Sequence, residues 1–408
     1  MTSQRLYYQN AYTTRFEATI VERVRDEDQT AVILDHTYFY PTSGGQPHDM
    51  GTLNNIAVHN VTIREKDAAV LHWLDTTDLW QNEVSGHVNW ARRFDHMQQH
   101  TGQHILSQAF IQVAQAETVG FHLSDNTLTI DLHSSQLNPN QVEEAEYLAN
   151  QIIWQNRPVH IRSVTMAQAK ELPLRKLPPV RQGNLRLIEI DKFDLSACGG
   201  THVRHSGEVG IIKIVKLERQ NNQLRVEFAC GQRALNDYRL KNSIVNQLSA
   251  ELTTGADEIV TSVQRSKEEN KENRRRLKKQ QEQLLFFEAK TLIEQAKMVG
   301  KTAVVTRVFG EDEIDPGQMR VLGNHLTQND HVVALLGLAA NKSQLLFCRS
   351  NDAPGEMNQL IKPALQILGS AAGGGSAVMA QGGGPGTDQE RVQQAIDKAE
   401  RLLIGQIR

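Results

Sequence analysis

Two short patterns of histidine and cysteine have the residue types and the spacing to bind a metal ion. His100 and His104 stand four residues apart in a helix-like run, so both imidazoles project from one face of a helix. Further along the chain, Cys198 and His202 are also four residues apart, and two glycines between them let the backbone turn so that both side chains converge. Three imidazoles and one thiolate form a donor set that suits zinc best.

The metal interpretation has two competitors. A pair of histidines on a helix can be ordinary packing in a chain with 15 histidines. The second pattern favours a metal site, because two pairs of soft ligands seldom gather without an ion. A metalloprotease would need a glutamate directly after the first histidine as its general base, and Thr101 stands there. The sequence therefore predicts one zinc ion per chain, held by His100, His104, Cys198 and His202.

The strings around these residues resemble a known family. His-Thr-Gly-Gln-His-Ile-Leu and Cys-Gly-Gly-Thr-His-Val are similar to the editing domain of alanyl-tRNA synthetase and to free-standing alanyl-tRNA editing proteins of the long AlaX type. Further matching strings lie at residues 39–47, 207–210 and 225–228. The editing domain of threonyl-tRNA synthetase has similar metal spacing, but Gly200-Thr201 before His202 is closer to the alanyl version.

The resemblance implies a hydrolase that acts on mischarged tRNA without ATP. Its expected substrate is the tRNA for alanine, carrying serine or glycine in place of alanine. The chain starts directly at its first β-rich region, without the aminoacylation domain that a synthetase needs, so charging of tRNA is not expected. Two alternatives remain open: a zinc-containing tRNA-binding factor without hydrolysis, and an editor of seryl-tRNA(Thr).

Residues 42–46, Thr-Ser-Gly-Gly-Gln, are a second candidate part of the site. The adjacent glycines permit close backbone approach, and Gln46 can both donate and accept hydrogen bonds. The spacing alone fits a hairpin turn equally well. The resemblance implies a loop that borders the aminoacyl pocket, with Thr42 and Gln46 as catalytic residues. His122 is the third catalytic candidate, although a lone strand histidine is more often structural. The candidate substrate-binding residues are Ser43, Gly44, Gly45, Asp131, Gly199, Gly200 and Thr201.

The role of zinc is left open by the sequence. If all four protein ligands bind tightly, the coordination shell is closed and the ion cannot activate water directly. A loosened ligand, or a fifth position taken by the substrate, would make zinc a recognition element, and this role is favoured here. No Ser-His-Asp arrangement or carboxylate pair stands out, so hydrolysis would depend on the metal and on a positioned water molecule.

The composition is that of a soluble globular chain. Its 408 residues are 39% hydrophobic and 22% charged, which allows several domains with substantial cores. The amino terminus lacks an apolar signal region, and the longest apolar run, 332–340, is too short to span a bilayer, so we expect a cytoplasmic protein without a membrane partner. Three cysteines argue against a disulfide framework, and Cys230 and Cys348 are expected to be buried.

Basic residues gather in two stretches although the formal net charge is −3. Residues 157–186 contain seven lysines and arginines against one acid, Glu171, and residues 265–279 contain eight. Such patches can bind phosphates, and for the second stretch a solvated helix face is an equally good explanation. The candidate tRNA-binding residues are Arg175, Lys176, Arg274, Arg275, Lys278, Gly374, Gly375 and Gly383.

The glycine-rich segment 373–384 is expected to be a loop. Six glycines bracket Met-Ala-Gln, and their exposed amides could approach phosphate. The Gly-Lys-Ser/Thr ending of a Walker A loop is absent, and a flexible linker is the alternative. The segment resembles the glycine-rich carboxy-terminal domain of alanyl-tRNA synthetase, which grips tRNA.

The pattern of apolar residues predicts an α+β multidomain protein. Helices are expected at 140–156 and from about 257 for roughly 40 residues. Strands are expected at 128–132, 185–190 and 209–215. The predicted domains are a β-barrel or sandwich (1–90), a zinc-binding editing domain (91–235), a coiled-coil-like helical arm (236–300) and an α/β glycine-rich tRNA-binding domain (301–408). The arm or the last domain is expected to mediate any homodimer.

Overall fold

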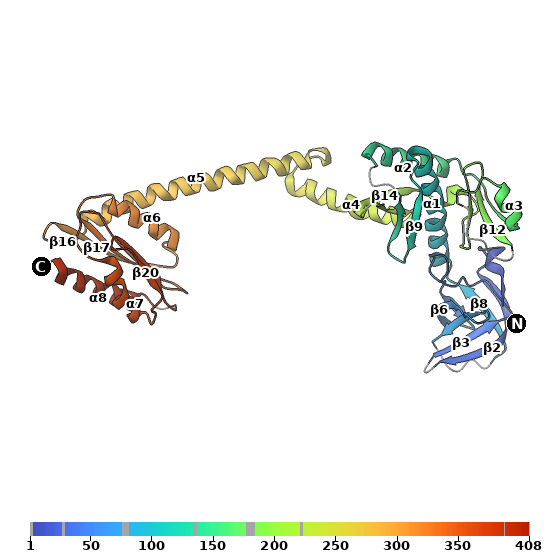
Figure 1. Ribbon diagram of the computed structural model, residues 1–408, viewed down its shortest axis with the longest axis horizontal. Helices are drawn as coiled ribbons and strands as arrows, with labels where there is room; N and C mark the ends of the chain where they lie inside the picture. The colour runs from blue at the N-terminus through green and yellow to red at the C-terminus, as the bar shows by residue number, and fades with distance from the viewer. Residues whose placement is uncertain are drawn as a thin grey trace. The chain divides into compact units, whose positions relative to one another are not determined.

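The computed structural model describes residues 3–26, 29–75, 81–133, 137–176, 184–220, 223–386 and 388–407. The chain divides into two compact units, residues 1–248 and 249–408 (Figure 1). Helices and sheets with antiparallel strand pairs occur in both units, so the predicted α+β multidomain class is confirmed. The finer division into four domains stays a prediction.

The first unit begins with a closed barrel, which decides between the predicted barrel and sandwich. Its six strands follow the order β2-β3-β7-β6-β5-β8. They are β2 (Arg15–Asp26), β3 (Gln29–Leu34), β5 (Gly51–Leu53), β6 (Ile56–Ile63), β7 (Val70–Leu74) and β8 (Glu83–Val88). A short parallel pair, β1 (Gln4–Arg5) and β4 (His36–Thr37), and the 3-10 helix η1 (Leu6–Tyr8) accompany it.

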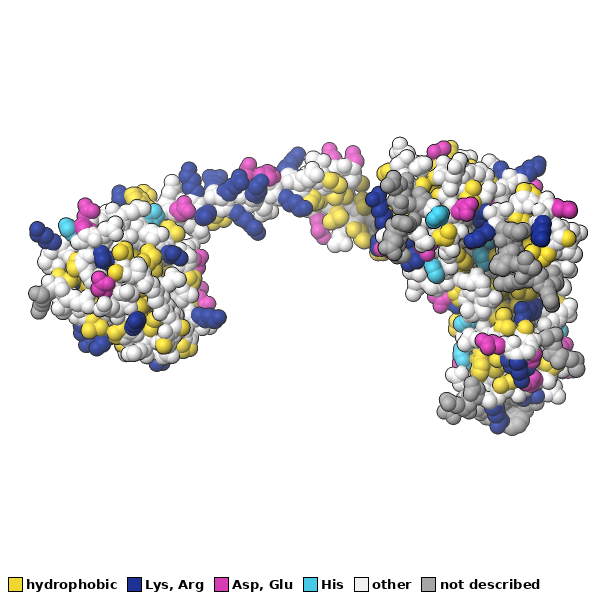
Figure 2. All heavy atoms as spheres, in the orientation of Figure 1, with side chains coloured by type: hydrophobic (Ala, Val, Ile, Leu, Met, Phe, Trp, Pro, Cys, Tyr) yellow, Lys and Arg dark blue, Asp and Glu magenta, His cyan; other side chains and the backbone are white. Residues whose placement is uncertain are grey.

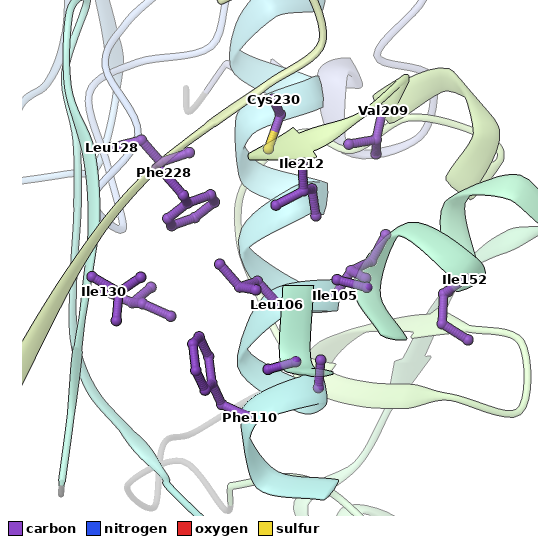
Figure 3. Close-up of a cluster of buried hydrophobic side chains, with 14 of the residues drawn as sticks. Ile105, Leu106, Phe110, Leu128, Ile130, Ile152, Val209, Ile212, Phe228 and Cys230 are labelled. Atoms are coloured by element: carbon purple, nitrogen blue, oxygen red, sulfur yellow. The ribbon is translucent and has the colours of Figure 1, made fainter. Parts of the chain in front are cut away.

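The helix α1 (Trp90–Ala114) leads from the barrel into the rest of the first unit. Asn89 caps its first turn by accepting a hydrogen bond from the Arg92 amide, and Gln115 ends it in the left-handed conformation. The middle of α1 is buried on nearly all sides. Its apolar residues Leu106 and Phe110 pack with strand residues in the core that Figure 3 shows.

Two antiparallel sheets and two helices surround α1. The larger sheet has the order β14-β15-β10-β9 and the smaller one β11-β12-β13. The strands are β9 (Thr118–Leu123), β10 (Leu128–Leu132), β11 (Val159–Val164), β12 (Leu185–Ile190), β13 (Asp194–Ala197), β14 (Ile212–Gln220) and β15 (Gln223–Cys230). The helices are α2 (Pro139–Trp154) and α3 (Met166–Glu171). The predictions at 128–132 and 185–190 match β10 and β12, and the helix predicted at 140–156 is α2.

The strand expected at 209–215 begins later than predicted. Residues Ser206–Val209 form the 3-10 helix η2, and the strand β14 starts at Ile212. His205 and Glu208 form a capping box at the start of η2, which satisfies local amides without a sheet partner. The first unit ends in α4 (Gly231–Leu252), in which Ala234 is the buried residue.

The second unit contains the long helix and an α/β layer. After the 3-10 helix η3 (Ala256–Glu258), α5 (Ile259–Glu294) runs for 36 residues, close to the predicted length, and its residues 264–284 are exposed. The sheet has the order β16-β17-β18-β19-β21-β20. Its strands are β16 (Lys297–Val299), β17 (Thr302–Gly310), β18 (Val332–Ala339), β19 (Gln344–Arg349), β20 (Gly373–Gly375) and β21 (Met379–Gly383). The other helices are α6 (Pro316–Thr327), α7 (Met357–Ile367) and α8 (Gln389–Ile407).

Helices cover both faces of this sheet. One core packs α7 and α8 against residues such as Leu335 and Phe347, and the other packs α5 and α6 against Leu336 and Leu346. The central strand β18 is buried at every position, as expected for a strand covered on both faces. The predicted α/β arrangement of this region is confirmed.

The expectation of a glycine-rich loop was wrong. Within 373–384, β20 and β21 form an antiparallel hairpin that extends the sheet from β19. A Cβ on Gly373 would lie 2.5 Å from Leu365 Cδ1, so the missing side chain lets this edge pack closely against α7. The glycines thus serve strand packing, and several of their amides are engaged in the ladder.

Two smaller expectations can be compared with the structure. Cys230 and Cys348 are both buried and free, as predicted. Burial raises the pKa of the Cys348 thiol to about 12, so it behaves as a small apolar side chain. In the part of the chain that the structure describes, none of the helices has the length and apolar character to cross a membrane.

Candidate metal centre

The four predicted ligands come together in one buried cluster. Their donor atoms all lie within 4.8 Å of one another, with His100 and His104 on α1 and Cys198 and His202 on the segment after β13. Cys198 Sγ is 3.3 Å from His100 Nε2 and 3.2 Å from His202 Nε2. In a tetrahedral zinc site, sulfur and nitrogen ligands are about 3.6 Å apart. The donor set and its spacing therefore fit a metal ion.

Gln46 fixes the orientation of the first imidazole. The Gln46 side-chain oxygen accepts a hydrogen bond from the Thr201 amide at 3.0 Å and lies 2.9 Å from His100 Nδ1. Because that oxygen only accepts, Nδ1 must carry the proton, which leaves Nε2 of His100 free to bind a metal. The Gln46 nitrogen donates to Thr201 Oγ1 at 2.9 Å. Gln46 is fully buried, so it positions His100 and Thr201 rather than facing solvent.

A buried carboxylate supports the second imidazole. His104 Nδ1 lies 3.0 Å from Asp194 Oδ2, and Ser196 Oγ donates to both oxygens of Asp194 at 3.0 and 3.1 Å. Arg175 Nε is 3.4 Å from Asp194, and its Nη1 donates to the His104 carbonyl at 3.0 Å. The arrangement resembles the carboxylate–histidine pairs that orient metal ligands.

The third imidazole has a hydroxyl partner. His202 Nδ1 lies 3.1 Å from Thr101 Oγ1, which also accepts a hydrogen bond from the Val203 amide at 3.2 Å. The residue that stands in place of the metalloprotease glutamate therefore orients a ligand. Each of the three rings has a partner on Nδ1 and turns its Nε2 edge toward the cluster, as metal binding requires.

The electrostatics of the cluster favour a thiolate. Burial of Cys198 raises the pKa of its thiol, but the neighbouring His100 and His202 outweigh this effect and hold that pKa well below its ordinary value. Burial lowers the pKa of His202 well below its ordinary value. A thiolate beside a neutral imidazole is the protonation state in which these groups bind metals.

The Cys198–His202 segment is shaped by a missing side chain and by an arginine. A Cβ on Gly200 would lie 2.1 Å from His100 Cε1, so a side chain at this position would strike the ligand ring. Arg186 Nη1 donates to the carbonyls of Cys198 and Gly200 at 2.8 and 2.9 Å, and its guanidinium lies over the Tyr8 ring at 5.3 Å. These contacts hold the backbone of the second ligand pair against the cluster.

Residues 43–46 form a tight turn next to the cluster. Ser43 and Gln46 bond to each other through both backbone groups, and Gly44 and Gly45 have φ of +56° and +81°. Positive φ at both central residues is the geometry of a type I′ turn, which glycine adopts without strain. A Cβ on Gly45 would lie 3.0 Å from the Phe121 ring, and that ring stacks on His100 at 5.3 Å between centroids. The turn and the cluster are therefore in contact through Phe121 and Gln46.

A buried ion pair ties this part of the barrel to α1. Arg93 and Asp49 are both fully buried, and Arg93 Nε lies 3.0 Å from Asp49 Oδ1. Arg93 also donates to the carbonyls of Ala11 and Tyr38, and Asp49 accepts from the Tyr40 amide. Every strong donor and acceptor of the pair has a partner, which makes the pairing tolerable in the core. It fixes residues 38–49 against the helix that carries His100.

Two of the predicted catalytic residues lie outside this cluster. Thr42 is exposed, and its Oγ1 lies 3.1 Å from His48 Nδ1. His122 follows Phe121 on β9, so it points to the opposite face of the sheet. There it lies 3.6 Å from Asp131, whose carboxylate accepts two hydrogen bonds from Arg225. The structure does not bring His122 or Asp131 to the metal ligands.

A pocket of about 230 Å³ opens beside the cluster. Two of its lining residues contact the cluster or its supports. Phe121 stacks on His100, and Ser196 donates a hydrogen bond to Asp194, the carboxylate that supports His104. Lys176 and Arg175 bring positive charge to its lining, and Glu117 brings a negative charge. Gly199 and Gly200, predicted to bind substrate, lie on the ligand segment, where Gly199 has room for a Cβ at 3.8 Å from Tyr8.

The predicted tRNA contacts differ in how free they are. The Arg175 side chain is 14% exposed and committed to Asp194, whereas Lys176 lines the pocket. The α5 residues Arg274, Arg275 and Lys278 are exposed. Gly374, Gly375 and Gly383 belong to the β20–β21 hairpin. Arg181, part of the first basic stretch, lies outside the described residues.

Sequence reasoning missed four residues that orient or contact the cluster. Asp194 and Ser196 alternate on β13 just before Cys198, so their side chains share the face that leads to the ligands. Thr101 was noted only as the absence of a glutamate, and the stacking of Phe121 on His100 was not anticipated. The available signal for Asp194 was the alternation of polar and apolar residues in the strand just before Cys198. It places the Asp194 carboxylate on the side of the ligands, where a buried carboxylate needs a partner.

Comparisons with known proteins show what the chain is similar to. The second additional domain of threonyl and alanyl tRNA synthetases matches residues 185–226, which include Cys198 and His202. The alanyl-tRNA editing protein AlaX-L of Pyrococcus horikoshii is 29% identical over 98% of this chain and 99% of that protein. The alanyl-tRNA editing protein Aarsd1 of Bos taurus is 33% identical over 57% of this chain and 53% of that protein.

Alanine–tRNA ligases match over a smaller share of their own length. The ligase of Pyrococcus furiosus is 28% identical over 98% of this chain, which spans 43% of the ligase. The solved C-Ala domain from Aquifex aeolicus alanyl-tRNA synthetase aligns with 26% of this chain and 96% of that chain at 24% identity, with a TM-score of 0.23. That score is too low to establish a shared fold. The matches along nearly the whole sequence show that the chain is similar to alanyl-tRNA editing proteins.

Proposed function

We propose that this protein hydrolyses the ester between tRNA(Ala) and a wrongly attached serine or glycine, with one zinc ion bound by His100, His104, Cys198 and His202. The observation that carries the proposal is the buried cluster of three histidines and a cysteine, whose donor atoms lie within 4.8 Å of one another. Its support is the similarity along nearly the whole chain to a protein named for alanyl-tRNA editing.

The residues around the cluster suggest a division of roles. Zinc, when bound, supplies a Lewis acid that can polarise or hold an oxygen or nitrogen of the substrate. Gln46, Asp194 and Thr101 each hold one ligand ring by its Nδ1. We assign them positioning roles, so Gln46 acts through His100 and not on the substrate. His122 is left out of the proposed site because it lies on the other face of β9.

The pocket beside the cluster is the proposed entrance for the aminoacylated end of the tRNA. Lys176 offers a cation for a phosphate, and Phe121 offers a ring edge next to His100. The ester at the tRNA 3′ end is already activated, so the site needs to orient water and exclude competing geometries. A pocket that hydrogen-bonds the serine hydroxyl would leave polar groups unpaired with alanine, and this would disfavour correctly charged tRNA.

The test is a deacylation assay with the purified full chain. Seryl-tRNA(Ala) should lose its amino acid much faster than alanyl-tRNA(Ala), and glycyl-tRNA(Ala) should be the second substrate. Equal rates on the seryl and alanyl forms would remove the editing assignment. Tight tRNA binding without hydrolysis would replace it with a binding factor, and preference for seryl-tRNA(Thr) would change the tRNA.

The zinc assignment is tested separately by elemental analysis of the same preparation. One zinc per chain is the expected content, and a chelator should lower both the content and the rate of deacylation. Activity that persists unchanged in a metal-free preparation would exclude a metal role. The prediction of a homodimer through the helical arm or the last domain is tested by measuring the mass of the particle in solution.

A further inference from the structure

A groove of about 480 Å³ lies between α5 and α6 in the second unit. On α5 it is lined by Lys279, Gln283 and Phe286, which follow the spacing i, i+4 and i+7 of one helix face. Asn324, His325 and Gln328 line the opposite wall from α6. With Glu282 and Val321, the groove thus combines one aromatic ring, one imidazole, one cation, one carboxylate, one aliphatic side chain and three carboxamide side chains.

His325 is a polar group in this groove without a partner. Both of its ring nitrogens are buried, and within the described residues neither has a hydrogen-bond partner. The Phe286 ring lies nearly perpendicular to the imidazole at 5.8 Å between centroids, and a phenyl ring has no nitrogen or oxygen atom to pair with the imidazole nitrogens. A buried donor or acceptor left unpaired costs stability, and a ligand that pairs with it recovers that cost.

The chemistry of the lining matches a nucleobase. Carboxamides can pair with the donor and acceptor edge of a base, and aromatic rings stack on its face. Phe286 is 40% exposed, so part of its ring is open to a group arriving from solvent, while Lys290 Nζ lies 4.7 Å from the ring centroid. Glu282 also lines the groove, which disfavours a site for a bare phosphate.

Positive charge leads along α5 to the groove. Arg274, Arg275, Arg276 and Lys278 are exposed in the turns just before Lys279. Figure 2 shows lysine and arginine side chains along this helix. A row of cations next to a stacking ring is how proteins follow a nucleic-acid backbone while holding its bases. The β20–β21 hairpin, the other candidate for RNA contact in this unit, lacks such a combination of side chains, because β20 consists of three glycines.

We propose that the α5–α6 groove holds one unstacked nucleotide of a bound RNA, with its base against Phe286, Gln283 and His325 and a phosphate at Lys279. The proposal rests on the proposed binding of tRNA and assigns the RNA contact of the second unit to this groove. The β20–β21 hairpin then has a structural role. The occupant is RNA because base stacking, amide recognition and a cationic approach are combined here.

The first test compares two single substitutions in the full chain. Phe286→Ala should weaken tRNA binding by about 5- to 150-fold, the effect of losing one base–aromatic stack, without changing the salt dependence. Lys279→Gln should weaken binding and reduce the salt slope by about 1, since it removes one phosphate contact. Gly405→Ala is the control, because its Cβ would have open space on α8 outside the groove, and it should bind tRNA like the unchanged protein.

A second measurement separates a direct contact from a folding effect. The binding of tRNAs that each lack one base is measured with the unchanged protein and with Phe286→Ala. At one position, the losses of binding free energy from removing the base and from Phe286→Ala should not be additive, because both changes remove the same stack. Full additivity at every position would overturn the proposal, as would normal binding by Phe286→Ala together with weak binding by Gly405→Ala. If the unchanged protein does not bind tRNA at all, the proposed function fails with it. If the unchanged protein binds tRNA and Phe286→Ala has no effect, the groove proposal is rejected and the proposed function is kept.

Discussion

The ligand segment 198–202 and the hairpin segment 373–384 are both rich in glycine, yet they use it differently. In the first, Gly200 leaves room for the ring of a ligand, since a Cβ there would lie 2.1 Å from His100. In the second, Gly373 and Gly375 leave room for other backbone and side-chain atoms of the sheet and α7. One segment therefore brings functional groups together, whereas the other completes a sheet.

The contrast lies in the neighbours of each segment and not in its own composition. Around Cys198 and His202, three buried side chains from distant parts of the sequence orient the ligand rings. Around β20, the partners are β21 and α7, and the groups that could recognise a ligand are amides of a strand ladder. A glycine-rich string thus predicts close approach, but the approaching group decides the function.

The largest expected effect concerns the thiolate of the ligand segment. Cys198→Ala removes the donor whose sulfur lies 3.2 to 3.3 Å from two imidazoles, so we expect most of the bound metal and nearly all deacylation activity to be lost. Elemental analysis and single-turnover deacylation measure the two quantities. A chelator should lower the melting temperature of the unchanged protein and leave that of the variant unchanged. Full metal content in Cys198→Ala would remove the thiolate from the proposed site.

The next effect compares two adjacent glycines. Gly200→Ala places a methyl group against the His100 ring and should reduce metal content strongly, because the ring must move. Gly199→Ala meets nothing nearer than the Tyr8 hydroxyl at 3.8 Å and should keep the metal. Metal content and circular dichroism of both variants provide the comparison. Equal metal loss in the two variants would show that general strain in the segment, and not contact with His100, is responsible.

Much of the fold could be predicted because local patterns determine it. β10, β12 and α6 have sequence signals that need no tertiary information: an alternating or apolar run bounded by turn residues, or a capped helix such as α6, which Asp315 and Gln318 begin. The hairpin β20–β21 could not be recognised in this way. Glycine has low strand propensity, and the pairing of β21 with β19 joins residues far apart in the sequence, from Cys348↔Met379 to Gln344↔Gly383.

The ligands of the candidate site could be predicted, but most of their supporting residues could not. Histidine and cysteine at fixed spacing carry their chemistry with them. Asp194 and Thr101 are common residue types whose role appears only when the fold places them beside a ring. Gln46 was recognised as polar and close to the site, but its burial changes its expected role from catalysis to positioning. Alternation along β9 also separates His122 from Phe121, which the sequence alone could not assign to faces.

A smaller effect is expected at Gln46. Gln46→Ala removes the acceptor that holds the Nδ1 proton of His100, and the loss of such a partner lowers metal affinity by about 10- to 100-fold. Gln46→Glu keeps an acceptor at the same place and should retain more affinity than the alanine variant. Competition with a coloured chelator measures the affinity, and Ser43→Ala in the same turn is the control. If Gln46→Ala abolishes turnover while metal affinity stays unchanged, Gln46 acts on the substrate, as the sequence first suggested.

The smallest expected effect tests the structural role of the hairpin. A Cβ on Gly375 would lie 2.2 Å from the carbonyl oxygen of Met379, a backbone atom that cannot move away without opening the turn between the two strands. A Cβ on Gly374 would meet nothing within 4 Å. We therefore expect Gly375→Ala to destabilise the hairpin by about 1–3 kcal/mol, as overpacking does, and Gly374→Ala to have little effect.

Hydrogen exchange measures this difference locally. In Gly375→Ala, amides of β20 and β21 should exchange faster, because they bond across the pairs Gly374↔Gln381 and Gly375↔Ala380. Metal content and deacylation at saturating tRNA should be unchanged, since the hairpin belongs to the second unit and the ligands to the first. A loss of metal in Gly375→Ala would mean that the two glycine-rich segments are energetically coupled. Faster exchange without any change at the cluster would confine the role of these glycines to completing the sheet.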